Sequence, residues 1–137
     1  METHLPLRTE GDQLVEEDLR HIAASLWDKG VAHTVITLGG HGSVVVEADR
    51  LRYVPWIRMP HVADPTAAGD SFVGALAVGV TVGLPYARAL EFASHTAAIT
   101  VSRMGAMPSL PTLEEVLALM RERNYQGFDF SVLDVLK

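Results

Sequence analysis

The sequence predicts an α/β fold, and three observations support this prediction. Apolar residues recur at helical spacing near the start of the chain: Val15, Leu19, Ile22 and Leu26. Two short apolar runs, at 34–38 and 43–48, flank a glycine-rich turn, as is typical of paired strands. Longer apolar stretches at about 69–83 and 86–103 predict two further helices.

The boundaries of the first elements follow from local sequence. Residues 1–12 are polar and predict an irregular segment, and Gly30 ends the first helix. Asp49 and Arg50 predict a turn into a third strand over 51–56. A helix followed by strands that are joined by tight turns predicts an α/β fold with a local antiparallel strand pair.

The second half of the chain reads as helical. The stretches 69–83 and 86–103 are apolar on most faces, so we expect both helices to be largely buried. Thr112 and Glu115 have the spacing of a capping box, which predicts the start of a last helix. Its core stripe would be Leu113, Val116, Leu117 and Met120. The tail from Tyr125 to Lys137 has no pattern that predicts an element.

Length and composition limit the classes of function. A chain of 137 residues predicts one domain over 1–137. Its net charge of −6 argues against nucleic acid or an anionic membrane as a partner. The chain has no cysteine, which excludes disulfides and thiolate chemistry and fits a reducing compartment, so we expect a cytoplasmic protein. No apolar stretch is long enough to predict a membrane span.

The most informative stretch is Asp64-Pro65-Thr66-Ala67-Ala68-Gly69-Asp70-Ser71-Phe72. Small residues let the backbone approach a ligand closely, and a helix that begins there directs free N–H groups at that ligand. The sequence therefore predicts an anion site for a phosphoryl group, with Asp70 placed as a general base. An ordinary helix start with Asp70 as a first-turn acid is the alternative.

Two further stretches carry weaker signals. A strand ends in Thr37-Leu38-Gly39-Gly40-His41-Gly42, where free backbone N–H groups could face phosphates, although a plain hairpin turn has the same composition. The segment 102–109 follows the second apolar helix and could be only a helix end with Gly105 as its cap.

These three stretches resemble motifs of the ribokinase-like (PfkB-type) carbohydrate kinases. The run from Asp64 resembles the D-T-x-G/A-A-G-D-x-F signature, with Pro65 in place of the usual threonine. The glycine turn resembles T-L-G-x-x-G, and 102–109 resembles T-R-x-G-A-x-P-S. The resemblance implies the C-terminal, nucleotide-binding and catalytic portion of a three-layer α/β/α sandwich. The N-terminal half of the family has no counterpart in this chain.

The resemblance also implies roles for particular residues. Asp70 would be the catalytic base, and the backbone N–H groups of Ala67, Ala68 and Gly69 would form an anion hole. The implied nucleotide-binding residues are Thr37, Gly39, Gly42 and Ser94, the last where the family often has asparagine. The implied ligands of a monovalent cation are Asp64, Thr66, Thr100, Arg103, Gly105 and Ser109. We expect His41 to be a surface residue and His95 to pack on its helix.

The family implies ATP-dependent phosphorylation of a sugar or sugar-like alcohol, with Mg²⁺ and K⁺ as cofactors. We expect this chain alone to be inactive, because the sugar-binding half is absent and Met1-Glu2-Thr3-His4 stand where the family has its N-x-x-E motif. The alternative is a non-catalytic nucleotide-binding or assembly module. A truncated sheet exposes an edge, so we expect a homo-oligomer. The sequence does not identify the sugar.

Overall fold

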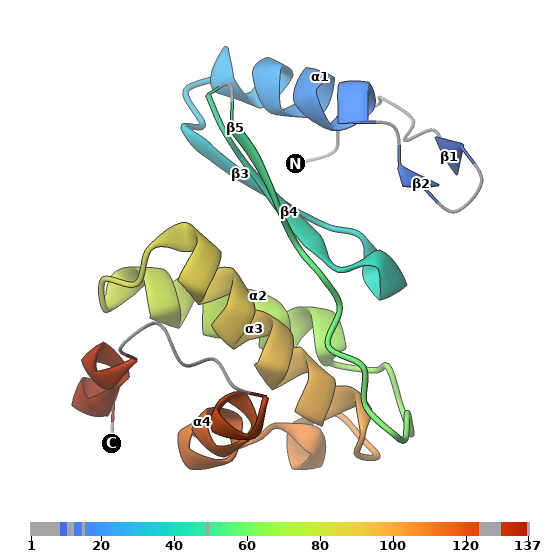
Figure 1. Ribbon diagram of the computed structural model, residues 1–137, viewed down its shortest axis with the longest axis vertical. Helices are drawn as coiled ribbons and strands as arrows, with labels where there is room; N and C mark the ends of the chain where they lie inside the picture. The colour runs from blue at the N-terminus through green and yellow to red at the C-terminus, as the bar shows by residue number, and fades with distance from the viewer. Residues whose placement is uncertain (1–8, 11–12, 15, 49, 124–129, 137) are drawn as a thin grey trace.

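The computed structural model describes residues 9–10, 13–14, 16–48, 50–123 and 130–136. Its main elements form stacked layers (Figure 1). One helix covers one face of a three-stranded sheet, two helices cover the other face, and a fourth packs outside them. The four helices are α1 (Glu16–Trp27), α2 (Ala68–Thr81), α3 (Tyr86–Val101) and α4 (Leu113–Glu122).

The sheet is a fully antiparallel meander in the order β3-β4-β5. Its strands are β3 (His33–Thr37), β4 (Ser43–Glu47) and β5 (Arg50–Val54). The predicted antiparallel pairing is confirmed and extends over all three strands. Arg50 pairs with Glu47, so the third strand begins one residue earlier than the sequence predicted.

The central strand β4 separates two apolar clusters, because successive side chains of a strand point to opposite faces. Val44 and Val46 pack with Leu19 of α1. Val45 packs on the other face with Phe72 of α2 and Leu90 of α3. Both faces of the sheet are therefore covered by helices, as the α/β prediction requires.

The expectation that both long apolar helices are largely buried is right for α3 and wrong for α2. All but one of residues 89–101 are buried, since α3 contacts the sheet, α2 and α4. In α2 only Ser71, Phe72 and Gly79 are buried, and Val73 is 60% exposed. The reason is position: α2 packs mainly against α3, and its opposite side has no covering element among the described residues.

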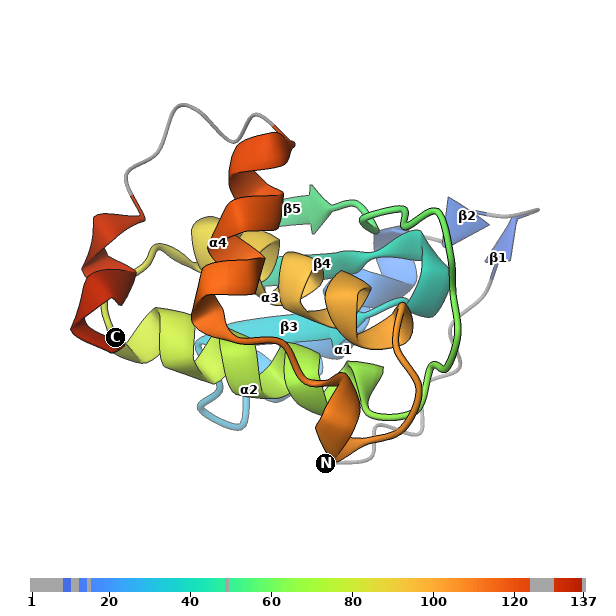
Figure 2. The same cartoon turned by 90° about the horizontal axis from the view of Figure 1, so that it is seen from below.

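Figure 2 shows α4 crossing over α3 on the side away from the sheet. Val116 and Met120 of α4 join Phe92 and Ile99 of α3 in a third apolar cluster. This cluster also contains Leu133, which is fully buried and belongs to a short 3₁₀ helix, η3 (Ser131–Leu136), in the tail that the sequence left unassigned.

The start of the chain is more ordered than predicted. The sequence predicted an irregular segment over 1–12, but β1 (Thr9–Glu10) pairs antiparallel with β2 (Gln13–Leu14). The motif position at Met1 to His4 lies outside the described residues.

Candidate active site

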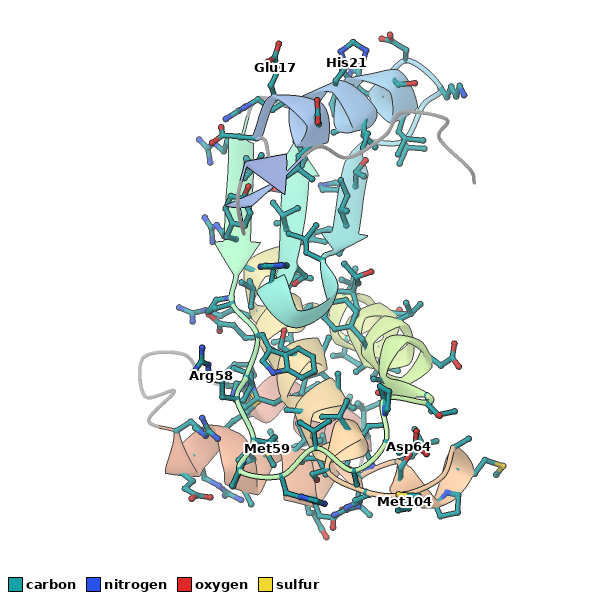
Figure 3. All side chains as sticks on the ribbon, turned by 90° about the vertical axis from the view of Figure 1, so that its right-hand side faces the viewer. Glu17, His21, Arg58, Met59, Asp64 and Met104 are labelled. Atoms are coloured by element: carbon teal, nitrogen blue, oxygen red, sulfur yellow. The ribbon has the colours of Figure 1, made fainter. Side chains whose placement is uncertain are left out.

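Asp64 joins two segments that are 41 residues apart in sequence. Its Oδ1 accepts hydrogen bonds from the backbone N–H and the hydroxyl of Thr66, with donor–acceptor distances of 2.9 and 2.5 Å. Its Oδ2 accepts from the backbone N–H of Gly105 at 3.1 Å. These bonds favour the ionised carboxylate and lower the pKa of Asp64. Figure 3 shows Asp64 and Met104 at the same end of the molecule.

The chain then turns sharply into α2. Ala67 is the N-cap residue and adopts a left-handed conformation with φ +59°, which costs a non-glycine residue about 1–2 kcal/mol. The N–H of Ala68 donates to the carbonyl of Pro65 at 3.2 Å, so this member of the predicted anion hole is already engaged within the turn. Gly69 lies in the first turn of α2, where N–H groups lack intrahelical acceptors.

Asp70 is an exposed side chain in the first turn of α2. With Ala67 it lines one part of a pocket of about 510 Å³. The pocket extends between α2 and the segment after Gly105, and Phe92, Met107 and Leu136 contribute to its mostly apolar wall. Asp70 is the only charged residue among the described residues that line it. A carboxylate therefore stands at a helix N-terminus beside an accessible hollow.

The predicted glycine turn is a short 3₁₀ helix, η1 (Gly39–His41), between β3 and β4. The N–H groups of Leu38, His41 and Gly42 donate to carbonyls inside the turn. Thr37 is exposed at the end of β3, and His41 is exposed as expected. Figures 1 and 2 place this turn and the N-terminus of α2 at the same end of the molecule.

Gly42 makes a close approach that no other residue type fits. Its φ is +96°, and a Cβ built there would lie 2.3 Å from the carbonyl oxygen of Val54 and 2.8 Å from the nitrogen of Trp56. The turn is thereby packed directly on the chain that leaves β5. Gly39, also a predicted nucleotide-binding residue, has a φ of +56° and open space around it.

Ser94 and His95 lie in the middle of α3. Ser94 is 5% exposed, and its predicted contact with a nucleotide stays a prediction. His95 is fully buried, as expected for a residue that packs on its helix, and its Nδ1 lies 2.6 Å from the carbonyl oxygen of Glu91. Burial lowers the pKa of His95. The described residues contain no cluster of three or more histidine, aspartate or glutamate side chains able to hold a metal ion.

Two of the other predicted cation ligands, Thr66 and Gly105, are hydrogen-bonded to Asp64 itself. The N–H of Arg103 donates to the carbonyl of Thr100 at 3.1 Å, and the buried hydroxyl of Ser109 donates to the carbonyl of Ala106 at 2.5 Å. The carbonyls of Arg103 and Gly105 accept no hydrogen bond from the part of the chain that the structure describes. Carbonyl oxygens suit K⁺ because they replace its hydration shell, so this oxygen-rich set fits a monovalent cation.

An ion pair between Arg103 and Glu115 was missed by the sequence reasoning. Arg103 Nη2 lies 2.5 Å and Nη1 3.4 Å from the two oxygens of Glu115. The same carboxylate accepts from the N–H of Thr112 at 2.7 Å, and the N–H of Glu115 donates to the Thr112 hydroxyl, which confirms the predicted capping box. The hydrogen bonds from Arg103 and Thr112 lower the pKa of Glu115 to about 2.

Comparison with known proteins identifies the family. The family model described as "pfkB family carbohydrate kinase" matches residues 8–113, well over half of the chain. The chain belongs to the pfkB family of carbohydrate kinases. This membership confirms the resemblance carried by the three motifs.

Several pfkB-family relatives are similar over most of this chain. Ribokinase of Schizosaccharomyces pombe is 39% identical over 101 residues, which are 73% of this chain and 32% of that protein. Fructokinase-1 of Oryza sativa subsp. japonica is 36% identical over 117 residues, 80% of this chain and 35% of that protein.

Solved structures confirm the fold. The structure of Arabidopsis thaliana ribokinase complexed with ribose and ATP matches with a TM-score of 0.75 and 30% identity, over 78% of this chain and 35% of that chain. This agreement supports a partial ribokinase-like α/β/α sandwich. The chain spans about a third of the length of these two relatives and of this structure. No described helix is long and apolar enough to cross a membrane.

Proposed function

We propose that this chain forms the nucleotide-binding and catalytic part of an ATP-dependent kinase that acts on a sugar or sugar-like alcohol. The observation that carries the proposal is the position of Asp70, an exposed carboxylate in the first turn of α2 beside a 510 Å³ pocket. Membership of the pfkB family supports it. The relative in Arabidopsis thaliana was solved with ribose and ATP, which supports this substrate class.

The proposed chemistry is general-base catalysis of phosphoryl transfer. Asp70 accepts the proton of a substrate hydroxyl while that oxygen attacks the γ-phosphoryl group of ATP. The N-terminus of α2, with Gly69 in its first turn, faces the negative charge on the transferring group. Thr37, Gly39, Gly42 and Ser94 are proposed to contact the nucleotide.

Two cations belong to this proposal. Mg²⁺ would arrive with ATP, bound by the phosphate oxygens, and would offset their negative charge. K⁺ would be held by oxygens of the ligand set around Asp64 and would supply positive charge next to that turn. Both roles follow from the family resemblance, and the K⁺ site is also supported by the carbonyl oxygens of Arg103 and Gly105.

We further propose that the chain alone binds nucleotide without turning over sugar, in a homo-oligomer in the cytoplasm. The chain spans about a third of its relatives, and α2 leaves Val73 and Val78 exposed. An exposed apolar helix face favours association with another copy. A non-catalytic nucleotide-binding or assembly module is the second candidate function, and the same observations favour it.

Isothermal calorimetry with ATP, Mg²⁺ and K⁺ tests the proposal, with the wild-type chain, Asp70→Asn and Asp28→Asn as the variants. Asp28 is an exposed acid beyond α1, on the other side of the sheet, and serves as the charge control. We expect all three proteins to bind ATP similarly, because Asp70 acts on the substrate hydroxyl. Absence of ATP binding by the folded wild-type chain would refute the nucleotide site.

Turnover tests the assignment of the base, and turnover by the chain alone would exclude the non-catalytic module. Ribose and fructose are offered with ATP, and ADP formation is followed. If the wild-type chain is active, Asp70→Asn should lower the rate by about 10²- to 10⁴-fold and Asp28→Asn should not. Equal rates in wild type and Asp70→Asn would remove the assignment of the base. Binding without turnover is the result expected for the chain alone, and it fits both candidate functions.

A further inference from the structure

The first turn of α4 holds the turn formed by residues 103–105 through the side chain of Arg103. Both terminal nitrogens of Arg103 face the carboxylate of Glu115, at 2.5 and 3.4 Å. Glu115 is itself fixed, because it accepts from the N–H of Thr112 at 2.7 Å. A guanidinium that meets both oxygens of a carboxylate has a defined orientation, so the pair fixes direction as well as distance.

The same turn is held from its backbone by Asp64. The N–H of Gly105 donates to Asp64 Oδ2 at 3.1 Å, and Asp64 Oδ1 binds Thr66 just before the turn into α2. Two carboxylates from distant parts of the chain therefore hold residues 103–105, one through the Arg103 side chain and one through the Gly105 backbone. The carbonyls of Arg103 and Gly105, in the same turn, accept no hydrogen bond from the described residues.

We propose that Glu115 is a positioning residue that, through Arg103, holds the carbonyls of residues 103–105 toward the monovalent cation. This inference rests on the proposed function, because it assumes the cation site around Asp64. Glu115 touches neither nucleotide nor cation in this account. It acts by restricting the 103–105 turn to the arrangement in which its carbonyl oxygens and the Asp64 segment face one ion.

A positioning role is separable from a purely stabilising one. The Arg103 and Glu115 side chains are 36% and 43% exposed, and exposed ion pairs contribute little to global stability. Substitution of Glu115 by glutamine keeps an oxygen acceptor for the Thr112 N–H, since glutamine also serves in capping boxes. Glu115→Gln therefore removes the charge opposite Arg103 and leaves the helix start intact.

The test measures the thermal unfolding midpoint during a KCl titration at constant ionic strength, with choline chloride as the balancing salt. Two controls accompany wild type and Glu115→Gln. Glu114→Gln removes the same charge from the neighbouring exposed position, whose side chain makes no hydrogen bond or ion pair with the described residues. Thr112→Ala removes the capping hydroxyl that accepts from Glu115 but leaves the Arg103 pair in place.

We expect K⁺ to raise the midpoint of wild type in a saturable way that choline does not reproduce. Glu115→Gln should need about tenfold more K⁺ for half-saturation, the lower end of the range for residues that orient metal ligands. Glu114→Gln and Thr112→Ala should keep the wild-type K⁺ dependence, although Thr112→Ala unfolds at a lower temperature.

Two results would overturn the inference, and they differ. A K⁺ response that is the same in wild type and Glu115→Gln refutes the role of Glu115 and leaves the cation site standing. A wild-type chain that binds ATP but shows no K⁺-specific response refutes the cation site itself, and the role of Glu115 with it.

Discussion

Replacement of Gly42 by alanine is the sharpest test of how the glycine turn is built. The added Cβ would lie 2.3 Å from the carbonyl oxygen of Val54 and 2.9 Å from the carbonyl carbon of Pro55, and both atoms belong to backbone. No side chain can rotate away to relieve these contacts. Residues 42–43 and 54–56 must instead move apart, although Ser43 pairs with Val54 in the sheet.

The expected cost follows from two terms. A non-glycine residue at a left-handed φ, here +96°, loses about 1–2 kcal/mol. Forcing an extra methyl group into a filled space costs a further ~1–3 kcal/mol. Gly42→Ala should therefore lower the free energy of unfolding by about 2–5 kcal/mol, a large share of the roughly 5–15 kcal/mol of an average protein.

The turn supplies its own controls. Gly40 has open space around it and no positive φ, so Gly40→Ala should change stability by no more than about 0.5 kcal/mol. Gly39 has open space but a φ of +56°, so Gly39→Ala should cost about 1 kcal/mol through conformation alone. Urea unfolding followed by circular dichroism gives the three values. Equal midpoints for Gly42→Ala and Gly40→Ala would refute the close-packing argument.

Three other perturbations have defined outcomes. Leu133→Ala should cost about 2–5 kcal/mol because Leu133 is fully buried, whereas Val135→Ala, at a 75% exposed side chain, should be nearly neutral. Thr112→Ala should cost about 1 kcal/mol through loss of the cap, measured by the same urea unfolding. Burial lowers the pKa of His95 below 6.5. The stability that comes from holding His95 neutral is therefore fully present above pH 6.5 and is lost as the pH falls through the pKa of the folded state. The slope of the free energy of unfolding against pH should be smaller in His95→Leu.

The elements that could be predicted from sequence depend on local patterns. The helical spacing of apolar residues predicted α1, and the apolar runs on either side of the glycines predicted the β3–β4 hairpin. The capping-box spacing of Thr112 and Glu115 predicted the start of α4. These features are set within a few residues. The motif around Asp70 likewise predicted a helix from about residue 69, and α2 begins one residue earlier, at Ala68.

The features that could not be predicted depend on distant neighbours. The bond from Gly105 to Asp64 spans 41 residues, and the Arg103–Glu115 pair spans 12. The burial of α2 was also overestimated from its sequence, because the apolar character of a helix does not determine how many elements pack around it. Leu133 followed a stretch without periodicity, so its burial in the cluster formed by α3 and α4 could be known only from the packed structure.

The central place of α3 has a consequence for how the molecule opens. The sheet, α2 and α4 all pack on this one helix, so solvent reaches its backbone only when several contacts break together. Its amide hydrogens should therefore exchange with deuterium last, at the rate of global unfolding, while those of exposed segments exchange through local fluctuations. Small residues such as Ala93, Ala97 and Ala98 fix the spacing around this helix. During evolutionary drift α3 should accept fewer substitutions than the exposed face of α1.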